Sequence, residues 1–252
     1  MTSFLAAIQF LTSLPVKRDI SPQQLGRAAA FFPAVGLVIG LVLAGLNWLL
    51  LQILPPAVVD ALLIVTLVLV TGALHLDGFA DTCDGLAGHR TVEERLKIMR
   101  DSRTGAFGVV GIVLLLLVKY VSLNNVPVEF TAAILIFLPV VSRWAMVYAV
   151  FAFRYARPSG LGLAYKQSTR LPQFTIATLT TLAVAAALFP FLSVTGFLLI
   201  AGIWIVATLL SIYFRHKFAG LTGDSYGAIN EVSEVMTLVF FIVIWTVADN
   251  LI

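Results

Sequence analysis

Three aspartates packed into eight residues, directly after a long apolar run, are the strongest chemical signal in the sequence. Asp77, Asp81 and Asp84 are spaced at i, i+4 and i+7. On a helix this spacing places all three carboxylates on one side, within an arc of roughly 60°. Like charges at such spacing repel, so a bound cation would stabilise them. Hard carboxylate oxygens suit Mg²⁺ or Mn²⁺ better than Zn²⁺, and we therefore expect a carboxylate-bound metal ion of this kind at this segment, at a membrane surface.

A second acidic cluster leads into the last apolar run. Asp224 and Glu231 are seven residues apart and share a helical face, with Glu234 roughly 80° further round. The small residues Gly227 and Ala228 between them allow a second helix or a ligand to approach closely. Helix capping and the helix dipole explain one or two of these acids. Because Glu234 borders the hydrocarbon, where an unpaired charge is costly, we expect this cluster to join the first around a metal.

Four other polar residues are candidates for contacts with a phosphate or a substrate. Arg100 and Arg103 follow the first aspartates and suit phosphate binding, with headgroup anchoring as an equal alternative. Arg143 lies about 15 Å inside an apolar run by helical rise, so it should face the protein interior and meet an acid or a phosphate. His75 is a candidate substrate-binding residue, although a hydrogen-bonded interfacial histidine is its simplest interpretation. A fifth, Lys119, is expected only to snorkel towards the membrane surface.

The composition indicates a polytopic membrane protein. The 252 residues are 60% hydrophobic and 12% charged, and the mean hydropathy is +1.01. Such an apolar share exceeds that of soluble domains. The lone cysteine, Cys83, excludes an internal disulfide framework. There is no glycine-rich phosphate loop ending in Gly-Lys-Ser/Thr, so a bound nucleotide would be held by metal and arginines.

Seven apolar stretches approach the length of about 20 residues that a membrane-spanning helix needs. We expect an all-α bundle of about seven transmembrane helices with short interfacial helices, forming a single domain over residues 1–252. The predicted spans are Phe31–Leu54, Val58–Leu74, Phe107–Leu123, Phe130–Phe153, Phe174–Phe189, Thr195–Phe214 and Val235–Ile252.

The distribution of positive charge predicts the orientation. About fourteen of the sixteen lysines and arginines lie in alternate loops, and the opposite loops contain none. Positive charge favours the cytoplasmic side of a membrane. We therefore expect a multi-pass protein of the cytoplasmic (inner) membrane, with the N-terminus inside and the acidic segments facing the cytoplasm. Thr91 and Glu94 fit a capping box that opens a short helix on this side.

Three segments resemble one known family. They are His75–Gly85, Ile98–Gly108 and Thr222–Ala228 with Glu231 and Glu234. Together with the length and the order of motifs, they are similar to the cobalamin synthase family, the adenosylcobinamide-GDP ribazoletransferases. The resemblance implies a Mg²⁺-dependent integral membrane enzyme that joins adenosylcobinamide-GDP to α-ribazole, or to its 5′-phosphate, and releases GMP.

The resemblance also implies where the reaction takes place. It assigns Asp77, Asp81, Asp84, Asp224, Glu231 and Glu234 to the site. On this basis Asp77, Asp81, Asp84 and Asp224 are candidate metal ligands, and Asp81, Asp84, Asp224, Glu231 and Glu234 are candidate catalytic residues. Candidate substrate-binding residues are His75, Arg100, Arg103 and Arg143. The expected partners are the two substrates and membrane lipid, with a homo-oligomer left open and no nucleic acid.

Two alternatives use the same residues differently. A CDP-alcohol or polyprenyl-diphosphate transferase would also use clustered acids, although its usual motif has a different spacing of glycine and arginine. A transporter would use the intramembrane Arg143 to line a path. The crowding of acids at one face, rather than at the membrane midplane, counts against transport.

Overall fold

The structure is a computed structural model that describes residues 2–15 and 27–250. Lys17, Arg18 and the last two residues of the final predicted span lie outside the described residues. All named elements in the described part are helices, which confirms the all-α prediction. They are α1 (Thr2–Leu11), η1 (Ala29–Phe31), α3 (Phe32–Leu50), α4 (Pro56–Val70), α5 (Leu74–Leu86), α6 (Val92–Ile98), α7 (Ala106–Asn124), α8 (Val128–Ala152), α9 (Leu161–Ser168), α10 (Leu171–Ala187), α11 (Phe189–Leu192), α12 (Thr195–Phe218) and α13 (Gly223–Asp249).

Within the described residues, five helices are long and apolar enough to cross a membrane. They are η1 with α3, then α7, α8, α12 and α13, and the bent pair α4 and α5 would make a sixth. The predicted fifth span corresponds to α10, which is apolar but has only 17 residues. The membrane-helix architecture is therefore confirmed, whereas the count of seven is not.

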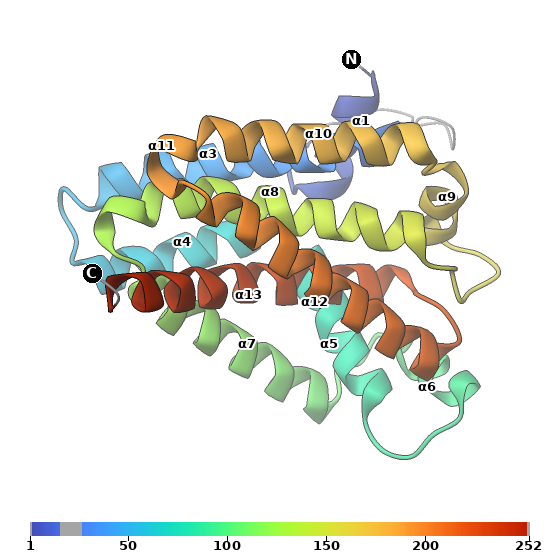
Figure 1. The fold of residues 1–252 in the computed structure, drawn as a ribbon. Coiled ribbons are helices and arrows are strands. Elements are labelled where there is room, and N and C mark those ends of the chain that lie inside the picture. Colours follow the sequence, from blue (N-terminus) through green and yellow to red (C-terminus); the bar gives the residue numbers. More distant parts are fainter. Residues whose placement is uncertain (1, 16–26, 251–252) are drawn as a thin grey trace.

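Helix α8 lies at the centre of the bundle, between α3, α10, α12 and α13 (Figure 1). It packs most extensively against α3, where two glycines allow the backbones to approach. A Cβ atom added at Gly40 would lie 2.6 Å from the Cα atom of Ile136, and one at Gly36 would overlap the carbonyl of Pro139. Small residues at such crossings are how membrane helices pack closely.

The chain bends by 88° between α4 and α5. At the bend Gly72 and Ala73 both have positive φ angles, of 59° and 55°. The prediction that the second span continues to Leu74 is therefore wrong in detail, because α4 ends at Val70. The bend turns α5, which holds the aspartates, away from the direction of the span and against the first half of α13 (Figure 1).

The connections of the bundle divide between its two ends. The turns at 51–55 and 125–127 lie at the end where α13 finishes (Figure 1). The connections at 87–91, 153–160 and 219–222 lie at the opposite end, together with α6 and α9. The polar loops that the described residues contribute therefore share one end of the molecule, and the first turn of α13 lies there as well.

Candidate active site between α5 and α13

The two acidic segments meet because α5 and α13 approach closely at two glycines. A Cβ atom at Gly78 would lie 2.9 Å from the Cα atom of Asp224, and one at Gly227 would lie 2.9 Å from the carbonyl oxygen of His75. Neither position has room for a larger side chain. The prediction that Gly227 allows close approach of a second helix is confirmed. Asp224 is thereby held beside the α5 turn that contains Asp77.

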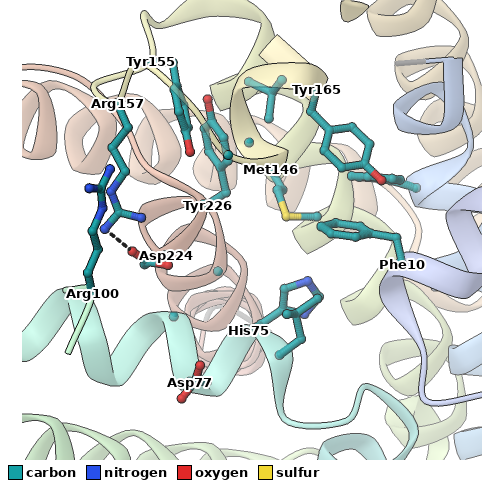
Figure 2. A pocket seen from close by; sticks show the side chains of 18 of the residues that line it. Phe10, His75, Asp77, Arg100, Met146, Tyr155, Arg157, Tyr165, Asp224 and Tyr226 are labelled. Carbon is teal, nitrogen blue, oxygen red and sulfur yellow. Dashed lines mark hydrogen bonds and ion pairs between the residues drawn. The ribbon is translucent and has the colours of Figure 1, made fainter. Parts of the chain in front are cut away.

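A cavity of about 410 Å³ opens at this contact. Its walls come from α1, α3, α5, α8, α9 and α13 and from the loops near Arg100 and Tyr155. Figure 2 shows Arg100, Arg157 and Asp224 along one side, with Phe10 and Tyr165 on the opposite side. The cavity therefore has a charged half and an aromatic half.

The charged half combines carboxylates with guanidinium groups. Arg157 Nη2 donates a hydrogen bond of 2.9 Å to Asp224 Oδ2, and both side chains are partly exposed. Asp77 is exposed on the wall contributed by α5, and Arg100 lies near Arg157. Asp81, half-buried, lies one helical turn beyond Asp77. In the described residues no side chain forms an ion pair or a hydrogen bond with the carboxylate of Asp77 or Asp81.

Asp84 has different surroundings from the other two aspartates of α5. Its Oδ2 atom accepts a hydrogen bond of 2.7 Å from the Gly105 amide, and its Oδ1 atom accepts one of 2.9 Å from Gly108. These amides belong to the start of α7, where backbone N–H groups have no partner within the helix. A side chain at Gly108 would place its Cβ atom 2.6 Å from Asp84 Oδ2. Asp84 therefore caps α7.

Glu231 and Glu234 belong to a buried ion cluster deeper in the bundle. Lys119 Nζ lies 2.7 Å from Glu231 Oε2 and 2.7 Å from Glu234 Oε2. Arg143 pairs with Glu234 Oε1, and both side chains are fully buried. The prediction that Arg143 faces the interior and meets an acid is confirmed. The prediction that Lys119 snorkels is wrong, because its side chain is only 3% exposed and holds two carboxylates.

His75 connects this cluster with the cavity. Its ring is buried and lines the cavity. Neither ring nitrogen has a hydrogen-bond partner in the part of the chain that the structure describes. The simple interpretation as a hydrogen-bonded interfacial histidine is therefore wrong.

Arg103 lies away from the cavity and forms a local pair with Asp101. Its Nη2 atom donates a hydrogen bond of 2.8 Å to Asp101 Oδ2, and its side chain is 86% exposed. Hydrogen bonds from the Arg103 side chain and backbone lower the pKa of Asp101 to about 2. This pair therefore stays ionised at any ordinary working pH.

Three residues that line the cavity were not predicted as site residues from the sequence. Arg157, Tyr155 and Tyr165 come from the segment between α8 and α9 and from α9 itself. Burial raises the pKa of both phenols, so both stay protonated. Their only signal in the sequence is an aromatic and basic stretch, 151–166, next to an apolar run. That pattern is common at membrane surfaces and does not indicate a site.

The carboxylates at the cavity could hold a divalent cation together with a substrate. Asp77 and Asp81 are unpaired oxygen donors on one face of α5, and Asp224 faces them from α13. Among the described residues no group of three or more His, Cys, Asp or Glu side chains lies close enough to hold a metal ion alone. Mg²⁺ is commonly bound by one or two carboxylates, with substrate phosphates and water completing its shell. The carboxylates therefore fit a Mg²⁺ ion whose remaining ligands are substrate phosphates and water.

Comparisons with known proteins agree on one family. The model of the cobalamin-5-phosphate synthase family matches residues 3–242. A protein of Geotalea daltonii named adenosylcobinamide-GDP ribazoletransferase is 41% identical over 251 residues, covering 96% of this chain and 97% of its own.

Two further relatives have the same name. The protein of Thermosynechococcus vestitus is 39% identical, over 95% of this chain and 96% of its own. That of a Roseiflexus species is 36% identical, over 92% and 86%. No solved structure matches the chain. The motifs, the helical fold and the matched length together show that this chain belongs to the cobalamin-5-phosphate synthase family.

Proposed function

We propose that this protein transfers the phosphocobinamide group of adenosylcobinamide-GDP to α-ribazole and releases GMP. The family and the names of the relatives support this activity. The structural observation that supports it best is the charged half of the cavity, where Asp77 and Asp224 lie with Arg100 and Arg157. Carboxylates opposed to guanidinium groups suit a pyrophosphate together with its counter-ion.

The reaction forms one oxygen–phosphorus bond and breaks another. The ribose hydroxyl oxygen of α-ribazole attacks the phosphorus attached to cobinamide, and the bond to the bridging oxygen breaks, so that GMP leaves. Arg100 and Arg157 orient the phosphates by hydrogen bonds. Asp224, in the cavity wall, accepts the hydroxyl proton. The same site accepts α-ribazole 5′-phosphate, whose additional phosphate extends towards the arginines.

Mg²⁺ belongs to this proposal as well. Asp77 and Asp81 would hold it, with the phosphates of the substrate as further ligands, which leaves Asp224 to accept the proton. When bound, it neutralises the charge of the pyrophosphate and of the departing GMP. We assign Asp84 to the positioning of α7 and Arg103 to the surface pair with Asp101.

Glu231, Glu234 and Arg143 act as positioning residues in the proposed mechanism. Their charges are paired within the buried cluster, so neither glutamate is available as the general base. The cluster fixes the register of α13, on which Asp224 lies. It also lies close to His75, which lines the cavity.

We further propose that the enzyme lies in the cytoplasmic membrane with its cavity towards the cytoplasm and its N-terminus inside. The excess of positive charge at the end of the bundle that contains the cavity supports this orientation. The apolar surfaces of α7 and α12 contact lipid.

The test is a product assay with purified protein in detergent or liposomes. Adenosylcobinamide-GDP, α-ribazole and Mg²⁺ should yield GMP together with the corrinoid product. A CDP-linked lipid supplied with an alcohol should yield no CMP. Excess EDTA should stop GMP release, and added Mg²⁺ should restore it. Release of CMP in place of GMP would instead identify a phospholipid-type transferase.

A further inference from the structure

The half of the cavity away from the charges is built from aromatic rings. Phe10, Phe32 and Tyr165 lie against one another, with ring centroids 4.7 to 5.8 Å apart. Tyr155 and Tyr226 stack at 6.3 Å and form a second wall, which lies between the first wall and Arg157 (Figure 2). Figure 2 shows the two walls with Met146 between them. We call this space the aromatic chamber, and its walls suit a flat apolar ring.

The chamber also contains polar atoms that have no partner. They are Nδ1 and Nε2 of His75 and the hydroxyl groups of Tyr165 and Tyr226, among the residues that the structure describes. These three side chains are between 2% and 4% exposed. Buried polar atoms are nearly always hydrogen-bonded, so several orphans around one cavity indicate a bound molecule that supplies their partners. That molecule must be flat, largely apolar and able to hydrogen-bond.

We propose that the aromatic chamber binds the base of the acceptor nucleoside. This inference rests on the proposed function and names the substrate that occupies this half of the site. The base of α-ribazole is a dimethylbenzimidazole, a fused apolar ring with one ring nitrogen free to accept a hydrogen bond. A phenol kept protonated by burial, as at Tyr165, is a suitable donor to that nitrogen.

The position of the chamber supports the acceptor over the donor. A base held between Tyr165 and Tyr226 directs its ribose towards the charged half, where Asp224 and Arg157 lie. The donor substrate contains guanine, whose edge is more polar than that of dimethylbenzimidazole. Guanine would need several hydrogen-bond donors and acceptors, whereas the chamber walls are mainly apolar rings. The corrinoid ring with its side chains is larger than the cavity of about 410 Å³ and stays outside it.

The kinetic test uses Tyr165→Phe and Tyr226→Phe. Each removes a hydroxyl group that has no partner within the described chain, so a merely structural role predicts no loss of folding or activity. We expect each change to raise the KM for α-ribazole about threefold to tenfold, and the KM for adenosylcobinamide-GDP less than twofold. The same rise is expected with α-ribazole 5′-phosphate, because both acceptors have the same base.

The matched control is Tyr213→Phe, which removes a phenol hydroxyl from the exposed surface of α12. It should leave both KM values unchanged. Equal effects of Tyr165→Phe and Tyr226→Phe on the two substrates, or an effect on the donor alone, would overturn the assignment. An unchanged acceptor KM in both variants would also overturn it.

A binding measurement separates this inference from the proposed function, because it needs no turnover. Free 5,6-dimethylbenzimidazole should bind the purified protein in equilibrium dialysis. Tyr165→Phe should weaken this binding, whereas Asp224→Asn, in the charged half, should not. Binding of 5,6-dimethylbenzimidazole without any GMP release in the product assay would support the chamber and contradict the proposed transferase activity. GMP release that depends on α-ribazole, without any binding of free 5,6-dimethylbenzimidazole to the unaltered protein, would contradict the chamber and leave the transferase activity standing.

Discussion

Asp81 and Asp84 are three residues apart on α5, yet their carboxylates have different surroundings. Both oxygens of Asp84 accept backbone hydrogen bonds from the start of α7. Asp81 is half-buried, and no described side chain pairs with it. A carboxylate with satisfied oxygens stabilises the fold, whereas an unpaired one beside Asp77 is available to a cation.

Replacing each aspartate by asparagine should separate these two roles. Asp84→Asn places an NH₂ group against a backbone N–H, so we expect a loss of about 1–3 kcal/mol in the free energy of unfolding. Asp81→Asn removes no hydrogen bond and should leave the melting temperature in detergent unchanged. It should lower GMP release about 100-fold or more, because it removes a proposed metal ligand. Near-normal turnover in Asp81→Asn would remove the metal role.

At this scale the sequence predicted part of the site. The i, i+4 spacing of Asp77 and Asp81 fixes their shared face as soon as the segment is helical, and α5 is helical. The partners of Lys119 could not be predicted in this way. They lie more than a hundred residues further along the chain, and only the packing of α7 against α13 brings them within 2.7 Å.

Between elements, the buried cluster joins α7, α8 and α13. Lys119, Arg143, Glu231 and Glu234 have two positive and two negative formal charges, so the cluster is neutral when all four are ionised. Removing one member leaves an uncompensated buried charge, which usually costs about 3–5 kcal/mol. Neutrality therefore matters more for stability than any one of the ion pairs.

Lys119→Met should accordingly destabilise the protein by about 3–5 kcal/mol, measured by unfolding in detergent. The double variant Lys119→Met with Glu231→Gln restores neutrality and should recover part of that loss. Lys97→Met, on the exposed face of α6, serves as the control and should change little. If Lys119→Met were as stable as Lys97→Met, the cluster would have no role in holding α13.

The contact of α5 with α13 gives a second prediction between elements. Gly78→Ala should cost about 1–3 kcal/mol, because the new Cβ atom would lie 2.9 Å from the Cα atom of Asp224. It should also lower GMP release by moving Asp224. Gly45→Ala is the matched control, since nothing lies within 4 Å of a Cβ atom there. Alanine is the better helix former, so this control should not lower the melting temperature.

At the scale of elements, apolar length predicted most spans but not the bend. The 88° turn depends on positive φ angles at Gly72 and Ala73, and alanine rarely takes that conformation. A hydropathy profile therefore shows no break at Ala73, and the predicted span runs on to Leu74. Since the bend directs α5 along α13, the sequence could predict that the two acidic segments meet but not which turns of the helices make the contact.

For the whole molecule, the described polar loops gather at one end of the bundle (Figure 1), and Arg157, Gly160 and Asp224 of that end line the cavity. The opposite end has the uncharged turns at 51–55 and 125–127. Loop charge alone predicted this division, because the positive-inside bias acts on short loops whatever the packing of the helices. Helix packing then decides which residues at the end with the polar loops form a site.

The proposed orientation predicts the accessibility of single cysteines. In a Cys83→Ser background, His89→Cys reports on the end with the cavity and Asn125→Cys on the opposite end, and both native side chains are exposed. In intact spheroplasts a membrane-impermeant maleimide should label Asn125→Cys and leave His89→Cys unlabelled until the membrane is permeabilised. Inside-out vesicles should give the reverse pattern. The Cys83→Ser parent should take up no label, and labelling of His89→Cys from outside would place the cavity on the wrong side for a cytoplasmic nucleotide substrate.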